Sequence, residues 1–581
     1  MTGQPISALT VLAVTAAIVA TIAIGAYGVR LARTTSDFLV ASRSVGSRWN
    51  AAAISGEYLS AASFLGVAGL IAKYGADALW YPVGFTAGYL GLLLFVAAPL
   101  RRSGAYTVPD FAEFRLGSRA LRRLAMVVVA VICVLYMVPQ FQGAGLALRI
   151  LLGWPAWVGA VVVALIVIAN VVGGGMRSIT FVQAFQYWLK LTAVAVPALV
   201  LTIAFLGDRH ELGTAAPPTV ADRTTVDVTT DVVVQVSQPL AVVVTGTLDG
   251  VAVDGPVALG VGEHELGAGT ALVLEAGAPV PVVAGAPPDG AGWLHPGWGF
   301  GEAHPLYQVY SLIVGIFLGT MGLPHVLVRF YTNPDGHAAR RTALVVIALV
   351  GGFYLFPALL GVFARLWVPQ LLITGTSDAA VLLLPGSVVD GAWGQVLAAL
   401  VAAGAIAAFL ATSSGLLVSV AGVLATDVLR GRVRDFRVAA VVAGGIAVLL
   451  AVAVASIDLS RTVGMVFAVA ASTLCPLLVL GIWWRGLTPA GAASGLVVGA
   501  VTSGSAAMLT AFGGIDGDLW HGWPQVVVGY PAAVTVPLAF AVMVVVSRAT
   551  SADVPADVAR TFTRMHAPER LGVGRDRERD L

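Results

Sequence analysis

The sequence predicts an all-helical protein that crosses a membrane many times, and three observations lead to this fold class. Of its 581 residues, 58% are hydrophobic and only 11% are charged, whereas soluble globular proteins have about 25% charged residues. The mean hydropathy is +0.90. The apolar residues also come in long stretches, and a hydrocarbon core needs about 20 such residues per helix. A bilayer is therefore the expected surrounding for most of the chain.

We count about thirteen apolar stretches, and most are too long for buried strands or ordinary core helices. Their approximate spans are 7–29, 48–73, 78–100, 122–149, 156–176, 181–206, 306–327, 342–366, 394–427, 437–457, 461–483, 487–512 and 526–547. The first has no basic segment before it, and Arg30 and Arg33 follow it. We interpret it as a membrane anchor and not as a secretion signal.

Basic residues fall in alternate loops of this helix count, for example Arg101 and Arg102 after the third span and Arg340 and Arg341 after the seventh. Loops rich in Lys and Arg stay on the cytoplasmic side. Arginine far outnumbers lysine, and alanine, valine and glycine dominate, as is typical of GC-rich bacterial genomes. We therefore expect a multi-pass bacterial inner-membrane protein with its N-terminus outside and its C-terminus in the cytoplasm.

Three segments do not belong to the membrane. Residues 207–304 contain alternating apolar patterns, at 231–236 and 240–244, with turn signals at Asp249-Gly250 and Asp254-Gly255. These features predict a small external β-rich insert. We interpret it as an elaborated loop; a surface for substrate capture or for a partner is the alternative. Residues 367–393 form a second external loop, and 548–581 a charged cytoplasmic tail that we expect to be partly disordered.

Glycine, serine and glutamate interrupt the second span near its middle, between Ala53 and Gly66. Small residues alone are explained by helix packing. Packing does not explain Glu57, because an ionisable group at that depth costs a few kcal/mol or more. Lys190 also lies deep in its span, which makes it a candidate structural partner of Glu57. We treat both as candidates for a proton or charge relay.

A second interruption lies in the seventh span, where Gly319, Gly322 and Pro324 precede His325. Proline breaks the helical hydrogen-bond pattern, and unwound backbone inside a bilayer must line a cavity or be buried in protein. A simple proline kink is the alternative. If the first span is accessory, the two interruptions fall in the first and sixth helices of a ten-helix core. Inverted five-plus-five repeats place their discontinuous helices there.

Three consecutive hydroxyl residues, Thr412 to Ser414, lie in the eighth core helix. One hydroxyl can bond back to its own helix at little cost, but three together suggest an oxygen-lined cation site. The two cysteines, Cys133 and Cys475, lie within apolar spans and form no metal-binding spacing. We interpret them as helix-packing residues.

These segments resemble the sodium/solute symporter family, and within it the cation/acetate symporter branch. The most specific stretch is Ser-Ala-Ala-Ser-Phe-Leu-Gly at 60–66. Further matching stretches are 104–107, Gln140 with 143–145, 173–176 with Thr180 and Gln183, and 322–325 followed by 329–332. The resemblance implies a leucine-transporter-like inverted five-plus-five helix repeat. We recognise no counterpart of the β-rich insert in that branch.

The implied organisation has six parts. They are 1–47 (accessory helix and loop), 48–206 (first repeat), 207–304 (insert), 305–483 (second repeat), 484–547 (two peripheral helices) and 548–581 (tail).

The resemblance also implies a sodium site between the first and eighth core helices. It maps onto the carbonyls of Gly56 and Leu59, the carbonyl of Ala408, and the side-chain positions of Ala411 and Thr412. The family often has two hydroxyls at these last positions, so Ala411 is a departure. Ser413 would be the substitute ligand, although it points about 100° further round the helix. Proton coupling through Glu57 is therefore an alternative to Na⁺.

The substrate site implied by the resemblance lies at the two helix breaks. Its expected residues are Ala62, Ser63, Gln140, Thr320, Met321, Gly322 and Pro324. The N-terminus of a half-helix offers free N–H donors to a carboxylate. Ala62 is small and apolar, which favours a small substrate with an alkyl end.

We therefore expect a symporter for a small monocarboxylate such as acetate, with Na⁺ or H⁺ as coupling ion and no cofactor. The expected partners are this substrate and the lipid bilayer, and no nucleic acid. Another organic solute, such as an amino acid, pyruvate or a larger acid, remains open. So does a membrane sensor, although the short tail leaves no room for a signalling domain. We find no nucleophile elbow, zinc-protease or P-loop motif that would indicate an enzyme.

Overall fold

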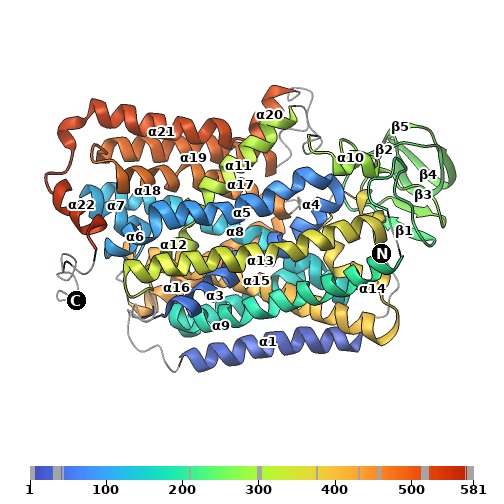
Figure 1. The fold of residues 1–581 in the computed structure, drawn as a ribbon, viewed down its shortest axis with the longest axis horizontal. Helices are drawn as coiled ribbons and strands as arrows, with labels where there is room; N and C mark the ends of the chain where they lie inside the picture. The colour runs from blue at the N-terminus through green and yellow to red at the C-terminus, as the bar shows by residue number, and fades with distance from the viewer. Residues whose placement is uncertain are drawn as a thin grey trace.

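The computed structural model describes residues 7–29, 41, 45–208, 211–297, 304–374, 377–429, 432–453, 459–511, 522–568 and 571. Long helices run side by side along the longest axis of the molecule, and a small β-sheet lies at one end of them (Figure 1). The helix α22 (Val558–His566) lies at the opposite end. The charged end of the tail, where we predicted disorder, lies outside the described residues.

The helices fall into two sets separated by the β-sheet. The first set is α1 (Ala8–Val29), α3 (Ser47–Tyr58), η2 (Ala62–Gly66), α4 (Val67–Tyr74), η3 (Gly75–Leu79), α5 (Trp80–Gly91), η4 (Leu92–Val96), α6 (Ala97–Arg102), α7 (Val108–Leu116), α8 (Arg119–Leu152) and α9 (Ala156–Asp208). The second set is α10 (Gly290–Leu294), α11 (Pro305–Gly322), α12 (Pro324–Phe330), α13 (Gly336–Trp367), η5 (Pro369–Leu372), α14 (Ala380–Val388), α15 (Gly391–Asp427), α16 (Val433–Ala453), α17 (Leu459–Ser472), α18 (Leu474–Trp483), α19 (Pro489–Ala511), α20 (Trp523–Gly529), α21 (Ala532–Ala549), η6 (Ser551–Asp553) and α22.

Within the described residues, eleven helical segments are long and apolar enough to cross a membrane. Two of them, 62–102 and 156–207, hold 41 and 52 residues, far more than one crossing needs. Each contains a glycine with positive φ, Gly75 (63°) and Gly175 (55°), at which a helix ends. Counting each of these two segments as two crossings gives 11 + 2 = 13, the number predicted from the sequence.

Gly175 reverses the direction of the chain within α9. Asn170 and Val182, which lie on either side of it, both approach within 4 Å of the position that a Cβ of Gly25 in α1 would take. A straight helix would separate them by about 18 Å at 1.5 Å per residue. The two halves of α9 therefore lie side by side against α1.

The predicted β-rich insert is an antiparallel sheet of seven strands. The strands are β1 (Thr224–Asp227), β2 (Val232–Val236), β3 (Leu240–Leu248), β4 (Val251–Leu259), β5 (Gly262–Leu266), β6 (Ala271–Leu274) and β7 (Val282–Val283). The turn predicted at Asp249-Gly250 joins β3 to β4, and both residues have positive φ. The turn predicted at Asp254-Gly255 is wrong. Both residues lie inside β4, which pairs only with β3 and so tolerates a glycine in an edge strand.

The insert has its own hydrophobic core, formed by one face of its strands. Val234, Val244 and Leu274 are fully buried there, and Leu372 and Ile373, at the end of η5, pack in the same core. The alternation of buried and exposed residues along β2 and β3 follows the period of two expected for a sheet with one solvated face.

The centre of the helical bundle is α15, whose middle is almost completely buried. Its small residues allow close approach, for example Gly404 to Ala193 of α9 and to Phe64 of η2. Close packing of small residues is the usual way in which helices associate in membranes. Cys133 and Cys475 are buried free thiols. The bundle thus brings α3, α9 and α15 together around one central region.

Candidate substrate and cation site

The first core helix opens near the middle of its span. The helix α3 ends at Tyr58, and Leu59 leaves the helical conformation with φ −72° and ψ 86°. The chain resumes with η2, a π-helical turn. Gly56 lies against α9 so closely that a Cβ would overlap the carbonyl oxygen of Gln183. The opening therefore leaves backbone carbonyls of α3 facing α9.

Lys190 of α9 occupies this opening. Its Nζ donates to the carbonyl oxygen of Leu59 at 2.6 Å and also to that of Gly56. The lysine side chain is completely buried. A buried ammonium is tolerated only when its donors are satisfied, and the carbonyls freed by the helix break supply the acceptors. The two carbonyls that we predicted as cation ligands thus hold a cation of the chain itself.

Glu57 pairs with an arginine and not with Lys190, the candidate structural partner. Glu57 Oε2 lies 2.6 Å from Arg329 Nε, and each side chain is 1% exposed. Arg329 belongs to α12 and also donates to Thr180 Oγ1, at 2.8 Å, and to Gln183 Oε1. The carboxylate fits because Gly415 of α15 has no side chain where Glu57 Oε1 lies. The pair joins both broken helices to α9.

The hydroxyl and carbonyl groups of α15 face the same region. Thr412 Oγ1 donates to the carbonyl oxygen of Glu57 at 2.6 Å, and the carbonyl oxygen of Ala411 accepts from Gln183 Nε2 at 2.8 Å. Ser413 Oγ is buried and has no hydrogen-bond partner among the described residues. Ala408 is also buried. Ala411 and Thr412 therefore lie on the face of α15 that contacts α3 and α9, and Ala408 lies one helical turn before them on the same face.

The second break lies where it was predicted, between α11 and α12. Leu323, with ψ 116°, separates the two helices, and Pro324 begins the second one. Gly319 and Gly322 are required because their Cα atoms approach the backbone of α17 too closely for a side chain. Thr320 Oγ1 lies 3.0 Å from the hydroxyl of Tyr58. The two broken helices therefore contact each other through their polar side chains.

Aromatic rings pack around Tyr58, at the end of α3. Tyr58 lies edge-on to Tyr89, Phe85 stacks on Tyr354, and Phe467 contacts Tyr58 and Phe85. Such rings give the apolar walls that an alkyl group needs.

The other predicted substrate residues are buried at or after the breaks, and two of them already have hydrogen-bond partners. Ser63 Oγ lies 2.7 Å from the hydroxyl of Tyr354. The carbonyl oxygen of Ala62 accepts from Ser460. Met321, Gly322 and Pro324 are buried at the second break.

Gln140 of α8 has a donor available in this region. Its Oε1 accepts from the backbone N–H of Ala61, the first helical residue after the break, at 3.1 Å. Its Nε2 is buried and has no hydrogen-bond partner in the described part of the chain. Both ring nitrogens of His325, which lies beside Pro324, are also buried without a hydrogen-bond partner among the described residues. Unpaired buried donors are costly, so they mark where a polar ligand would be stabilised.

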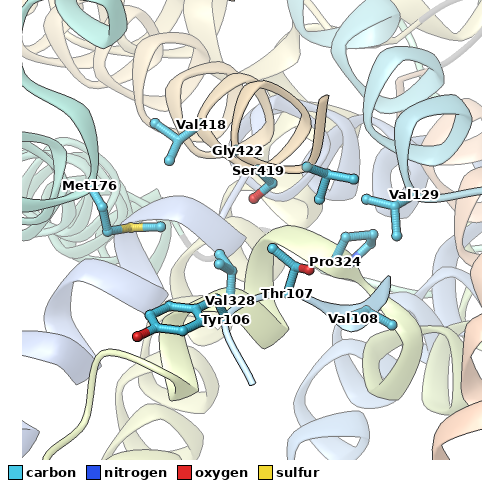
Figure 2. Close-up of a pocket in the computed structure, with 11 residues that line it drawn as sticks. Tyr106, Thr107, Val108, Val129, Met176, Pro324, Val328, Val418, Ser419 and Gly422 are labelled. Atoms are coloured by element: carbon cyan, nitrogen blue, oxygen red, sulfur yellow. The ribbon is translucent and has the colours of Figure 1, made fainter. Parts of the chain in front are cut away.

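A narrow, mostly apolar cavity lies beside the second break. Figure 2 shows Pro324 and Val328 of α12 on one side and Ser419 and Gly422 of α15 on the other. Thr107, in the loop between α6 and α7, also lines it. The cavity therefore reaches from the second break to this loop.

Arg329 was missed as a site residue by the sequence reasoning. It was noted as part of a matching stretch and was counted among the basic residues of the cytoplasmic loops, whereas the structure buries it completely. The signal that could have identified it is its position, seven residues after Gly322 in a short half-helix. An arginine so close to a helix break, directly after an apolar span, needs a buried acid as its partner if it is buried.

Comparison with known proteins agrees with this architecture. A sequence model of the sodium:solute symporter family matches residues 38–253 and 296–499. The chain belongs to this family. The match leaves out residues 254–295, which lie within the insert.

A family member of Bacillus subtilis named uncharacterized symporter YwcA is 28% identical over 539 residues, 90% of either chain. A Corynebacterium glutamicum protein named monocarboxylic acid transporter is 29% identical over 537 residues, 88% of this chain and 86% of that one.

A solved structure supports the fold of this symporter. A Na⁺-coupled sialic acid symporter in its substrate-bound, outward-open state aligns with a TM-score of 0.60 over 94% of this chain and 98% of that one. The sequence identity is 13%, so the likeness shows the fold alone. The predicted all-helical, leucine-transporter-like fold is confirmed.

Proposed function

We propose that this symporter couples the uptake of a small monocarboxylate, such as acetate, to the inward movement of a cation, Na⁺ or H⁺. The observation that carries the proposal is the pair of broken helices in contact at mid-span, with Gln140 Nε2 unpaired beside them. A carboxylate accepts from such donors, and the aromatic rings of Tyr58, Phe85 and Phe467 give walls for an alkyl chain. One relative is named a monocarboxylic acid transporter.

Transport follows from alternating access of this central space to the two sides. The half-helices α11 and α12 meet at a single extended residue, Leu323. The angle between the two helices can therefore change at this residue with little loss of helical hydrogen bonds. The cavity beside Pro324 extends toward the loop that contains Thr107, which we assign to the cytoplasm. We assign the β-sheet insert to the outside, with the N-terminus, and the tail to the inside. The substrate enters from the side of the insert and leaves through this cavity.

The substrate class is tested by uptake of labelled acetate into proteoliposomes, with competition by a panel of solutes. Propionate and other short monocarboxylates should compete, because they share the carboxylate and a short alkyl end. Acetamide, which has the shape of acetate without its charge, should compete poorly. Competition by amino acids or sugars with no effect of short acids would assign another solute to the site, and absence of acetate uptake would overturn the proposal.

A further inference from the structure

The sodium site implied by the family resemblance does not fit this chain, because a lysine occupies it. The carbonyl oxygens of Gly56 and Leu59 both accept from Lys190 Nζ. Na⁺ is bound by oxygen atoms, and an ammonium seeks the same oxygen acceptors. Both carry one positive charge, so a single pair of carbonyls cannot hold both at once.

Two oxygen atoms near this position, Ser413 Oγ and Glu57 Oε1, are buried without hydrogen-bond partners among the described residues. The other groups there are unsuited to Na⁺. Ala411 has no hydroxyl. Thr412 points its hydroxyl proton at the carbonyl oxygen of Glu57, at 2.6 Å. The carboxylate of Glu57 is paired with Arg329 at 2.6 Å. Two charged groups, Lys190 and Arg329, therefore surround the one carboxylate, and a further cation there would be repelled.

Lys190 reaches the opening because of the face that it shares with two other residues of α9. Gln183, Tyr187 and Lys190 are spaced by four and three residues, so they lie on one side of the helix. Gln183 and Tyr187 pack directly against Gly56. This contact aligns α9 with the end of α3 and carries the ammonium to the freed carbonyls. Glu57 of α3 interacts electrostatically with Lys190. Arg329 of α12 faces Glu57.

The basic residue at this position is a lysine, although arginine is far more common in this chain. The chain has 31 arginines and two lysines, Lys73 and Lys190. Lysine carries a compact, point-like charge with three donors, whereas the guanidinium of arginine is a planar fork. Only the compact ammonium resembles a monovalent metal ion in size and charge.

We propose that the Lys190 ammonium replaces Na⁺ between the first and eighth core helices, so that this position binds no Na⁺. The inference rests on the proposed function, since it names the cation that holds the broken helix during transport. The lysine supplies the positive charge that closes α3 onto α9. Substrate binding is then independent of Na⁺, and truncation of the lysine opens a Na⁺ site.

The experiment measures ²²Na⁺ binding to the purified full-length protein, which needs no knowledge of the substrate. Lys190→Ala should bind one Na⁺ more per protein than the parent, because the carbonyls of Gly56 and Leu59 become free. Lys73→Ala, the same change at the other buried lysine, should bind the same number of Na⁺ as the parent. Equal numbers of Na⁺ bound by the parent and by folded Lys190→Ala would overturn the proposal.

A second measurement keeps the inference separate from the proposed function. Acetate binding to the parent should be equal in Na⁺ and in choline, whereas Lys190→Ala should bind acetate about tenfold more tightly in Na⁺, by linkage between the two sites. If Lys190→Ala does not fold, Na⁺-dependent acetate binding by the parent still overturns the inference. Failure of acetate to bind any variant overturns the proposed function alone, since the ²²Na⁺ result stands without it.

Discussion

Lys190 Nζ lies 2.6 Å from the carbonyl oxygen of Leu59, so a side chain of α9 closes the open end of α3. The contact lies deep in the bundle, where both residues are fully buried. It links α9 to the end of α3, two helices of the first half of the chain. The ion pair between Glu57 and Arg329 instead links the first half of the chain to the second. These two contacts fix the position of α3 relative to α9 and to α12.

Removal of one member of the ion pair should destabilise the protein strongly. Glu57→Gln leaves Arg329 as an uncompensated buried charge, which costs about 3–5 kcal/mol. The double variant Glu57→Gln with Arg329→Met should be more stable than the sum of the single changes predicts. Unfolding in detergent, followed by fluorescence, measures all four proteins. Additive losses would show that the two side chains do not interact.

Gly415 should tolerate no side chain. A Cβ there would overlap Glu57 Oε1, so Gly415→Ala should displace the carboxylate and cost about 1–3 kcal/mol through overpacking, with loss of uptake. Gly445→Ala in α16 is the matched control, because nothing lies within 4 Å of its Cβ position. Equal uptake by both variants would place the Glu57 carboxylate elsewhere.

Gln140 should determine the affinity for the anion. Gln140→Leu removes the Nε2 donor that we assign to the substrate carboxylate. A hydrogen bond to a charged group is worth about 1.5–3 kcal/mol, so affinity should fall roughly tenfold or more. Gln142→Leu makes the same change two residues further along α8, where the side chain instead donates to Ala451. If binding of acetate by calorimetry weakens equally in both, Gln140 is not a substrate ligand.

Thr412 should stabilise the contact between α15 and α3. Thr412→Val keeps the shape and removes the hydroxyl that donates to the carbonyl oxygen of Glu57, at a cost of about 1 kcal/mol. Thr412→Ser keeps the donor and should lose less. Unfolding temperatures of the two variants in the same detergent measure the difference. A less stable serine variant would show that the methyl group, and not the hydroxyl, matters here.

The insert should show a pH dependence of its own. The hydrogen bond to Asp249 raises the pKa of His264, and the hydrogen bond from His264 lowers the pKa of Asp249. The histidine contribution is present below its unfolded pKa of about 6.5 and is lost as pH rises through the raised value. The aspartate contribution is present above about 3.9 and is lost as pH falls.

The hairpin between β3 and β4 should therefore be most protected between about pH 4 and 6.5. Hydrogen exchange of the peptide that covers Asp249 measures this protection, corrected for the intrinsic pH dependence of exchange. Asp249→Asn is the control, because asparagine also accepts the positive φ of this turn. A corrected profile that is the same for parent and control would show that the pair contributes nothing.

The helix breaks could be predicted from the sequence because their causes are local. Pro324 cannot continue the helix before it, because it lacks a backbone N–H, and Glu57 is costly in an apolar span unless it serves a site. The turn at Asp249-Gly250 was predicted correctly for the same reason. Asp254-Gly255 carries the same local signal, but pairing of β4 with β3 overrides it.

The partners of the buried charges could not be predicted in this way. The depth of Lys190 in its span was evident, but its reach to Leu59 depends on how α9 packs on Gly56. The choice of Arg329 as the partner of Glu57 depends on bringing together residues 272 positions apart. Such contacts follow from tertiary packing, which no local pattern in one sequence specifies.

The most direct test of the account is accumulation of labelled acetate in proteoliposomes under an imposed cation gradient. With Lys190 in the place of Na⁺, the account predicts that the internal concentration rises above the external one when an H⁺ gradient points inward, that a protonophore abolishes the excess, and that a Na⁺ gradient alone gives none. Equal internal and external concentrations under both gradients would contradict coupled transport.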